Sequence, residues 1–265
     1  MRKHSDALIH GHIPTVTLKM ALGMLTGFFA ITAFNAVDTF FVAQLGSAEL
    51  AAMTFTFPVV LMIGSLSMGM GMGIISVVSR ALGAQDRERA KRMITDGLLL
   101  SVIVALVSTT VGISSMEFIF RSLGADGEVL NLVHQYMYTW FFAVPFVVLT
   151  MAGNNVIRAT GDTLTPSLIM GLTVLVNVIL DPLVIFGIGP FPEMGIQGAA
   201  LATVLARVCA LLLAAWILVR RLRLIAFEWL SLNDMLAGWK AILKIGIPAA
   251  LVQIINPISM AFIVA

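Results

Sequence analysis

Long apolar runs constrain this chain more than any other feature of its sequence. Seven runs lie at roughly 16–43, 50–78, 93–118, 131–156, 166–187, 196–219 and 243–265. A helix of about 20 apolar residues crosses a bilayer core, and a helix satisfies its own backbone hydrogen bonds there. Charged residues make up 11% of the chain, against about 25% in soluble domains. The sequence therefore predicts an all-α polytopic membrane protein.

The basic residues indicate which ends of the spans face the cytoplasm. They crowd the segment SRALGAQDRERAKR after the second span and the segment VRRLR after the sixth, whereas the alternate loops hold only Arg121. Cytoplasmic loops carry the excess of Lys and Arg. This distribution predicts a cell (inner) membrane protein, surrounded by lipid, with a cytoplasmic N-terminal arm at 1–14. Basic residues confined to loops give no indication of nucleic-acid binding.

A faint internal repeat suggests two lobes. Lys19 opens the first span and Lys244 opens the seventh, each preceded by Leu, and they stand 225 residues apart. Six-helix repeats of this kind are common in transporters. The sequence predicts a six-helix N-terminal lobe at 15–223 and a cytoplasmic linker at 224–242. The first helix of an incomplete second lobe is then expected at 243–265, with the missing lobe in the same full-length polypeptide.

Two acidic residues lie well inside spans. An ionised Asp at a helix centre costs about 2.5–3.5 kcal/mol, so such residues usually face a cavity or a partner. Asp38, Asp181 and Thr203 each lie six to eight residues from the outer end of their span. Asn177 precedes Asp181 by four residues and shares its helix face. The sequence predicts that these four side chains meet at similar depth.

The chemistry of these four residues suits a coupling ion. Carboxylate, amide and hydroxyl oxygens are the ligands of hard cations, and neighbouring carboxylates in low dielectric resist carrying two charges, which favours a shared proton. We expect H⁺ or transient Na⁺ at Asp38, Asn177, Asp181 and Thr203, no tightly bound metal and no cofactor. The alternative is that each side chain makes a separate helix–helix hydrogen bond.

Other features of the spans carry less specific predictions. Asn35 is three residues before Asp38 and is a possible cavity residue. Arg207, in the sixth span, is expected to pair with an acidic group, to line a cavity or simply to pack against helices. The glycines of SMGMGMG at 67–73 predict close helix approach. The sequence shows no HExxH or GxSxG motif, so we do not expect an enzyme.

Several segments together resemble the multidrug and toxic compound extrusion (MATE) family. They are VDTFFVAQLGSAELAA at 37–52, SRALGAQDRERA at 79–90, RATGDTLTP at 158–166, NVILDPLVIFG at 177–187 and MGIQGAALATVLAR at 194–207. The resemblance implies a twelve-helix fold in two lobes, of which this chain covers the first and the start of the seventh helix. It also implies a secondary antiporter that exports small organic cations or drugs in exchange for Na⁺ or H⁺.

The resemblance also implies roles for particular residues. By motif, the ion- or proton-binding positions of the N-terminal lobe fall on Asp38, Asn177, Asp181 and Thr203. These are the residues that depth and chemistry had already selected. Asn154, just before the RATGD segment, is implied as a possible cavity residue.

Two departures from the family pattern concern the first and seventh spans. The first span contains Gly23 and Gly27 but lacks the proline that some members use for bending on protonation, so that bending model is not expected here. The seventh span contains Asn256 and lacks the carboxylate that some members carry there. The missing carboxylate favours the DNA-damage-inducible F-like branch, with ion coupling in the N-terminal lobe.

Two other functions are compatible with the sequence. A lipid-linked oligosaccharide flippase has a related fold, but it favours a basic cavity for pyrophosphate, and only Arg207 is available here. A truncated, non-transporting half protein is the other alternative, because the chain stops at Ala265 inside an apolar run.

Overall fold

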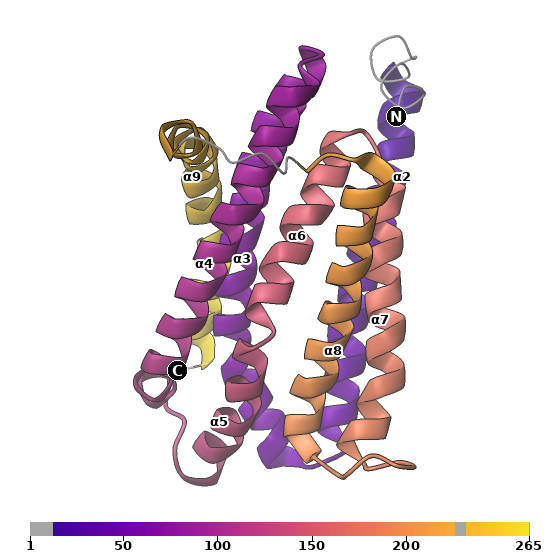
Figure 1. The fold of residues 1–265 in the computed structure, drawn as a ribbon. Helices are drawn as coiled ribbons and strands as arrows, with labels where there is room; N and C mark the ends of the chain where they lie inside the picture. The colour runs from indigo at the N-terminus through magenta and orange to yellow at the C-terminus, as the bar shows by residue number, and fades with distance from the viewer. Residues whose placement is uncertain (1–12, 226–231, 265) are drawn as a thin grey trace.

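The computed structural model describes residues 13–225 and 232–264, and every regular element in these ranges is a helix (Figure 1). All but the end of the expected arm at 1–14 lies outside the described residues. The helices are α2 (Ile13–Ala43), α3 (Ser47–Gly83), α4 (Arg87–Ser122), α5 (Gly127–Phe141), α6 (Val144–Ala159), α7 (Leu164–Ile185), α8 (Gly195–Trp216), the π-helical turn η1 (Ile217–Leu222) and α9 (Leu232–Val264).

The helices have the length and composition of membrane spans. Within the described ranges, α3, α4, α7, α9 and the continuous α8–η1 are long and apolar enough to cross a bilayer. The bent pair α5 and α6 raises this number to as many as six. α2 covers the first expected span but is not in this set, so its crossing stays a prediction. The all-helical membrane fold expected from the sequence is confirmed.

The fourth expected span is broken in two. α5 and α6 meet at a 47° bend around residues 142–143. Pro145 stands in the first turn of α6, where it has no N–H to donate and its ring clashes with the carbonyl group four residues earlier. That carbonyl belongs to Phe141, and it accepts a hydrogen bond from Thr109 Oγ1 at 3.4 Å. A neighbouring helix thus satisfies the backbone group that the proline leaves free.

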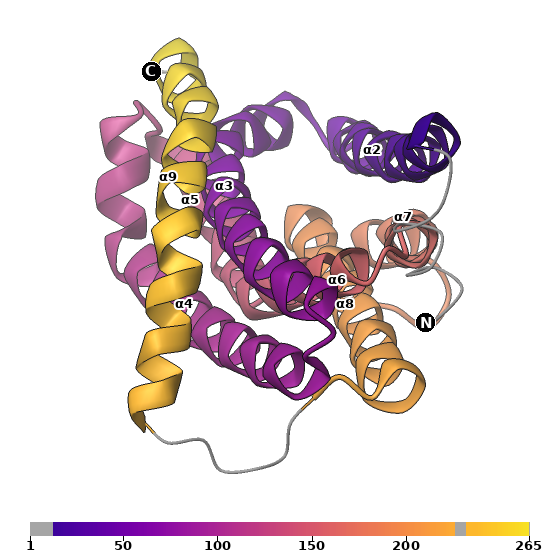
Figure 2. The ribbon, with the colours of Figure 1, turned by 90° about the horizontal axis from the view of Figure 1, so that it is seen from above.

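The helices pack as an antiparallel bundle with α3 near its middle. α3 contacts α4, α5, α6 and α9, while α2 packs on α7 and α7 packs on α8. Figure 2 shows α9 beside α3 and α4, with α2 and α7 on the other side of the bundle. This arrangement places α2, α5, α7 and α8 around one region of the interior.

α9 begins earlier than the sequence predicts. It starts at Leu232, inside the segment 224–242 that was expected to be a linker. Its first turns pack on the start of α4, where Trp239 Nε1 donates to the Asp96 carbonyl oxygen at 3.0 Å. Gly238 faces the Asp96 carboxylate so closely that a Cβ would lie 2.5 Å from Oδ2. These contacts extend the helix beyond its apolar stretch, which is why hydropathy alone places its start too late.

The glycines of SMGMGMG confirm the expected close helix approach. A Cβ on Gly69 would lie 2.5 Å from Ala250 Cβ and 2.6 Å from the Ala250 backbone. Gly73 faces the carbonyl oxygen of Ile242 in the same way. Gly69 and Gly73 therefore form a backbone-to-backbone seam between α3 and α9. Gly71 instead faces Asn155 of α6.

The seam gives a prediction about stability. We expect Gly69→Ala to lower the stability of the folded bundle by about 1–3 kcal/mol, because an added methyl group meets backbone that cannot yield. Thermal unfolding in detergent measures this. Gly64→Ala is the matched control on the same helix, with open space around the new methyl group. It should be neutral or stabilising by about 0.5–1 kcal/mol. An equal loss of stability in both variants would contradict the view that close packing at Gly69 stabilises the bundle.

Candidate functional site

α7 contributes two polar side chains to the bundle interior. Asn177 and Asp181 are both fully buried, one helical turn apart on one face. Asn177 Nδ2 donates to Asp181 Oδ1 at 2.9 Å. Pro182 follows inside the helix, and its missing N–H interrupts the backbone ladder beside the carboxylate. The local sequence thus fixes an amide–carboxylate pair where the helix is weakest.

α2 packs along α7 and carries the second buried carboxylate. Asp38 is 4% exposed, and its charge acts on Asp181, so the two ionised carboxylates repel each other. The charges of both also act on Tyr136 of α5, which is buried. Sequence reasoning missed Tyr136, because a tyrosine near the end of a span resembles an ordinary interfacial aromatic residue.

α8, the third helix of this region, contributes the hydroxyl group of Thr203. Gly198 lets α8 approach the end of α7, since a Cβ there would lie 2.7 Å from the Val184 carbonyl oxygen. Thr203 lies further along α8, is 3% exposed, and its Oγ1 has no hydrogen-bond partner in the described protein. Thr173 of α7 behaves as membrane threonines usually do, donating to the Ile169 carbonyl oxygen at 2.8 Å.

This region contains a set of buried oxygens without partners. Within the described residues, Asp38 Oδ1, Asn177 Oδ1, Asp181 Oδ2 and Thr203 Oγ1 are buried and make no hydrogen bond to protein. Each such group has a substantial desolvation cost. Three of the four atoms can only accept, so they suit a cation, a proton or a donor such as water. We call these four side chains the oxygen cluster.

The remaining predicted residues fall at different places. Asn154 of α6 is 5% exposed, and its Oδ1 also lacks a partner. Asn35 is exposed on α2 and is not part of the buried group. Arg207 is half-buried, and its guanidinium carbon lies 5.1 Å from the centroid of the Phe34 ring. This contact joins α8 to α2, and the role of Arg207 stays a prediction.

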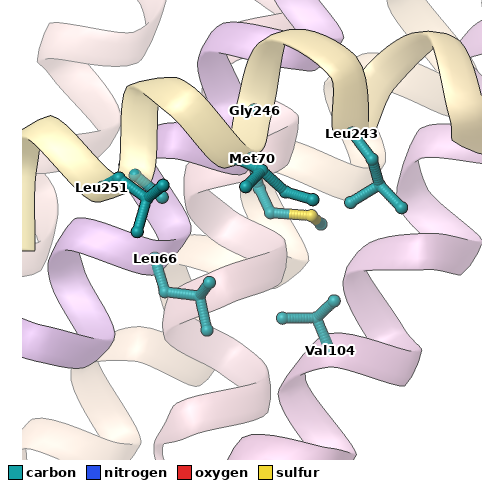
Figure 3. A pocket seen from close by; sticks show the side chains of 8 residues that line it. Leu66, Met70, Val104, Leu243, Gly246 and Leu251 are labelled. Atoms are coloured by element: carbon teal, nitrogen blue, oxygen red, sulfur yellow. The ribbon is translucent and has the colours of Figure 1, made fainter.

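A hollow elsewhere in the bundle is wholly apolar. It has a volume of about 170 Å³ and lies between α3, α4 and α9 (Figure 3). Figure 3 shows Leu66 and Met70 facing Leu243 and Leu251, with Val104 below them. No polar side chain lines this hollow, so we locate the candidate site at the oxygen cluster instead.

Ionisable residues buried within membrane helices are typical of proteins that move ions or substrates across a membrane. Residues 24–183 match the protein family described as MatE. The chain belongs to this family of multidrug and toxic compound extrusion transporters, whose members are not enzymes. The family membership expected from the sequence is confirmed.

Individual relatives support the same conclusion. The chain is 41% identical over 263 residues to a FAD transporter of Shewanella oneidensis, covering 99% of this chain and 58% of the relative. It is 27% identical to a probable multidrug resistance protein, YoeA, of Bacillus subtilis, covering 90% of this chain and 50% of the relative. The chain therefore spans about half the length of these relatives.

Solved structures of transporters match the fold of this chain. A MOP superfamily transporter from Pyrococcus furiosus superimposes with a TM-score of 0.82 at 31% identity, covering 93% of this chain and 54% of the other. An outward-facing multidrug resistance MATE family transporter gives a TM-score of 0.80 at 32% identity, covering 90% and 52%. Half-length coverage agrees with the expectation that this chain corresponds to one lobe of a longer fold.

The amide–carboxylate pair gives a prediction about the site. Asn177→Leu removes the donor to Asp181 and leaves a buried carboxylate oxygen without a partner, which costs about 1–3 kcal/mol. We expect a lower Tm in detergent. Asn131→Leu is the control, because Asn131 is exposed on α5 and should leave Tm almost unchanged. An Asn177→Leu protein as stable as the wild type would show that the hydrogen bond does not hold Asp181.

Proposed function

We propose that this chain supplies the N-terminal lobe of an ion-coupled exporter of small organic molecules, with the oxygen cluster as its coupling site. The observation that carries the proposal is that Asp38, Asn177, Asp181 and Thr203, on three helices that pack on one another, each have one buried oxygen without a hydrogen-bond partner. Three helices supply these atoms. A site built from separate helices can change its affinity when those helices move.

Charge repulsion provides the coupling step. With both carboxylates ionised, Asp38 and Asp181 repel each other across the interface between α2 and α7. Binding of H⁺ or Na⁺ from the outside neutralises part of this charge, and the two helices then pack more closely. Asp38 is the only member of the oxygen cluster on α2, so α2 moves relative to the pair held on α7. This movement changes the substrate cavity and releases the substrate outward.

The return step needs the ion to leave on the other side. We infer an N-terminus in the cytoplasm of the cell (inner) membrane, from the excess of Arg and Lys in the segments 79–92 and 219–223. The oxygen cluster then lies in the outer half of the bilayer. Alternating access exposes it inward, where the ion dissociates and the carboxylates regain their mutual repulsion.

Two substrate classes are supported by separate observations. The relatives named as multidrug proteins, YoeA and the MepA export proteins of Staphylococcus, support varied organic molecules, including cations. The FAD transporter, 41% identical over 99% of this chain, supports an anionic flavin dinucleotide. Family membership favours export of either class over transport of a lipid-linked oligosaccharide.

Neutralising either carboxylate tests the coupling site. In the full-length protein, Asp38→Asn and Asp181→Asn should each reduce ion-driven export into everted membrane vesicles by at least about tenfold, because no charge change remains to drive α2. Glu117→Gln is the control, since Glu117 forms an exposed ion pair with Arg121 at 3.0 Å, which is worth little. Unchanged export and ion dependence in Asp38→Asn would refute the mechanism.

A further inference from the structure

Phe34 and Arg207 each lie one helical turn from a member of the oxygen cluster, Asp38 and Thr203 respectively. Phe34 precedes Asp38 by four residues on α2, and Arg207 follows Thr203 by four residues on α8. Asn177 precedes Asp181 by the same spacing on α7. Four residues correspond to about 6 Å along a helix. With α2 and α7 running outward and α8 running inward, all three shifts point toward the cytoplasm.

The side chains therefore form two tiers. The outer tier contains Asp38, Asp181 and Thr203, and the inner tier contains Phe34, Asn177 and Arg207. The contact between Arg207 and Phe34 joins α8 to α2 within the inner tier, with the guanidinium carbon 5.1 Å from the ring centroid. A negatively charged tier thus stands directly beside a positively charged one.

Within the part of the chain that the structure describes, no carboxylate forms an ion pair with Arg207. In the described ranges, the ion pairs are Lys91–Glu88 and Arg121–Glu117, both near helix ends. Arg207 takes part in neither, and its Nε is buried without a hydrogen-bond partner. A cation–π contact is a weak interaction, whereas placing an arginine inside a membrane span has a larger cost. The ring offsets only part of that cost.

The chemistry of Arg207 and Phe34 indicates which ligand suits them. A guanidinium group binds phosphate or carboxylate through two parallel hydrogen bonds. Phe34 places an aromatic ring beside the guanidinium, and aromatic rings pair favourably with one another. A ligand that satisfies both groups carries an anionic group next to an aromatic ring system.

We propose that Arg207 and Phe34 form a substrate-recognition point for aromatic organic anions, in which the guanidinium binds phosphate or carboxylate. This inference rests on the proposed export function and names its substrate class. It differs from the organic cations that the family resemblance implies. Arg207 contacts the substrate's anionic group and takes no part in ion coupling.

The test is equilibrium binding to the purified full-length protein, with matched ligands. FAD and riboflavin share the flavin ring, but only FAD carries phosphate groups. Fluorescein supplies an aromatic carboxylate, and ethidium supplies an aromatic cation. Binding is followed by ligand fluorescence for the wild type, Arg207→Met, Arg207→Lys and the exposed control Arg121→Met.

We expect Arg207→Met to weaken binding of FAD, fluorescein or both by at least about tenfold, as for loss of a charge-assisted hydrogen bond. Riboflavin and ethidium should bind as in the wild type. Loss with FAD alone identifies phosphate as the recognised group, and loss with fluorescein alone identifies carboxylate. Arg207→Lys should fall between, because it keeps the charge and loses the planar fork. Arg121→Met should match the wild type.

Three results would overturn the inference. The first is equal affinity of Arg207→Met and the wild type for both anions, including the case in which neither anion binds. The second is an equal loss for all four ligands, which means that Arg207 only supports the fold. The third is a larger loss for ethidium than for either anion. Asp38→Asn separates this inference from the function itself, because it should abolish ion-driven export while FAD binding at equilibrium persists.

Discussion

In a bilayer core, no solvent is available to satisfy a polar group, so each helix must satisfy its own backbone and most of its side chains. Several hydroxyl side chains of this chain are satisfied within their own helix. Ser65, Ser101 and Thr173 each donate to the carbonyl oxygen four residues earlier, at 2.7–2.8 Å. The oxygen cluster departs from this pattern, because each of its four side chains has a buried oxygen without a hydrogen-bond partner in the described residues. The cost of leaving these oxygens without partners is the energetic basis of the proposed ion site.

Much of this site could be predicted from the sequence because helix geometry is fixed. Because the rise per residue is constant, the position of a residue along a span gives its depth in the membrane. Residues four positions apart share one face of the helix. These two rules were enough to place Asp181 beside Asn177. They were not enough for Tyr136, whose importance comes from charges on α2 and α7, distant in sequence. The bend at Pro145 and the early start of α9 likewise depend on neighbouring helices.

The two tiers have different consequences for the two substrate classes. For a cationic substrate, an ion in the outer tier competes directly, because both seek the same carboxylates. For an anionic substrate, neutralising the carboxylates strengthens attraction to Arg207. Ion binding would then tighten substrate binding, so competition between ion and substrate does not explain release. Release must then come from movement of α2, which carries Phe34 together with Asp38. The contact between Phe34 and Arg207 would open as the carboxylates draw closer.

The seam between α3 and α9 affects how the bundle responds to force. At Gly69 and Gly73, backbone faces backbone with no flexible side chain between. Interdigitated side chains can slide past one another by changing rotamer. A backbone-to-backbone contact between helices is instead either formed or broken. Separation of these helices would therefore proceed as a threshold event. Small displacements on either side would be resisted, and a sufficient one would part several glycine contacts at once.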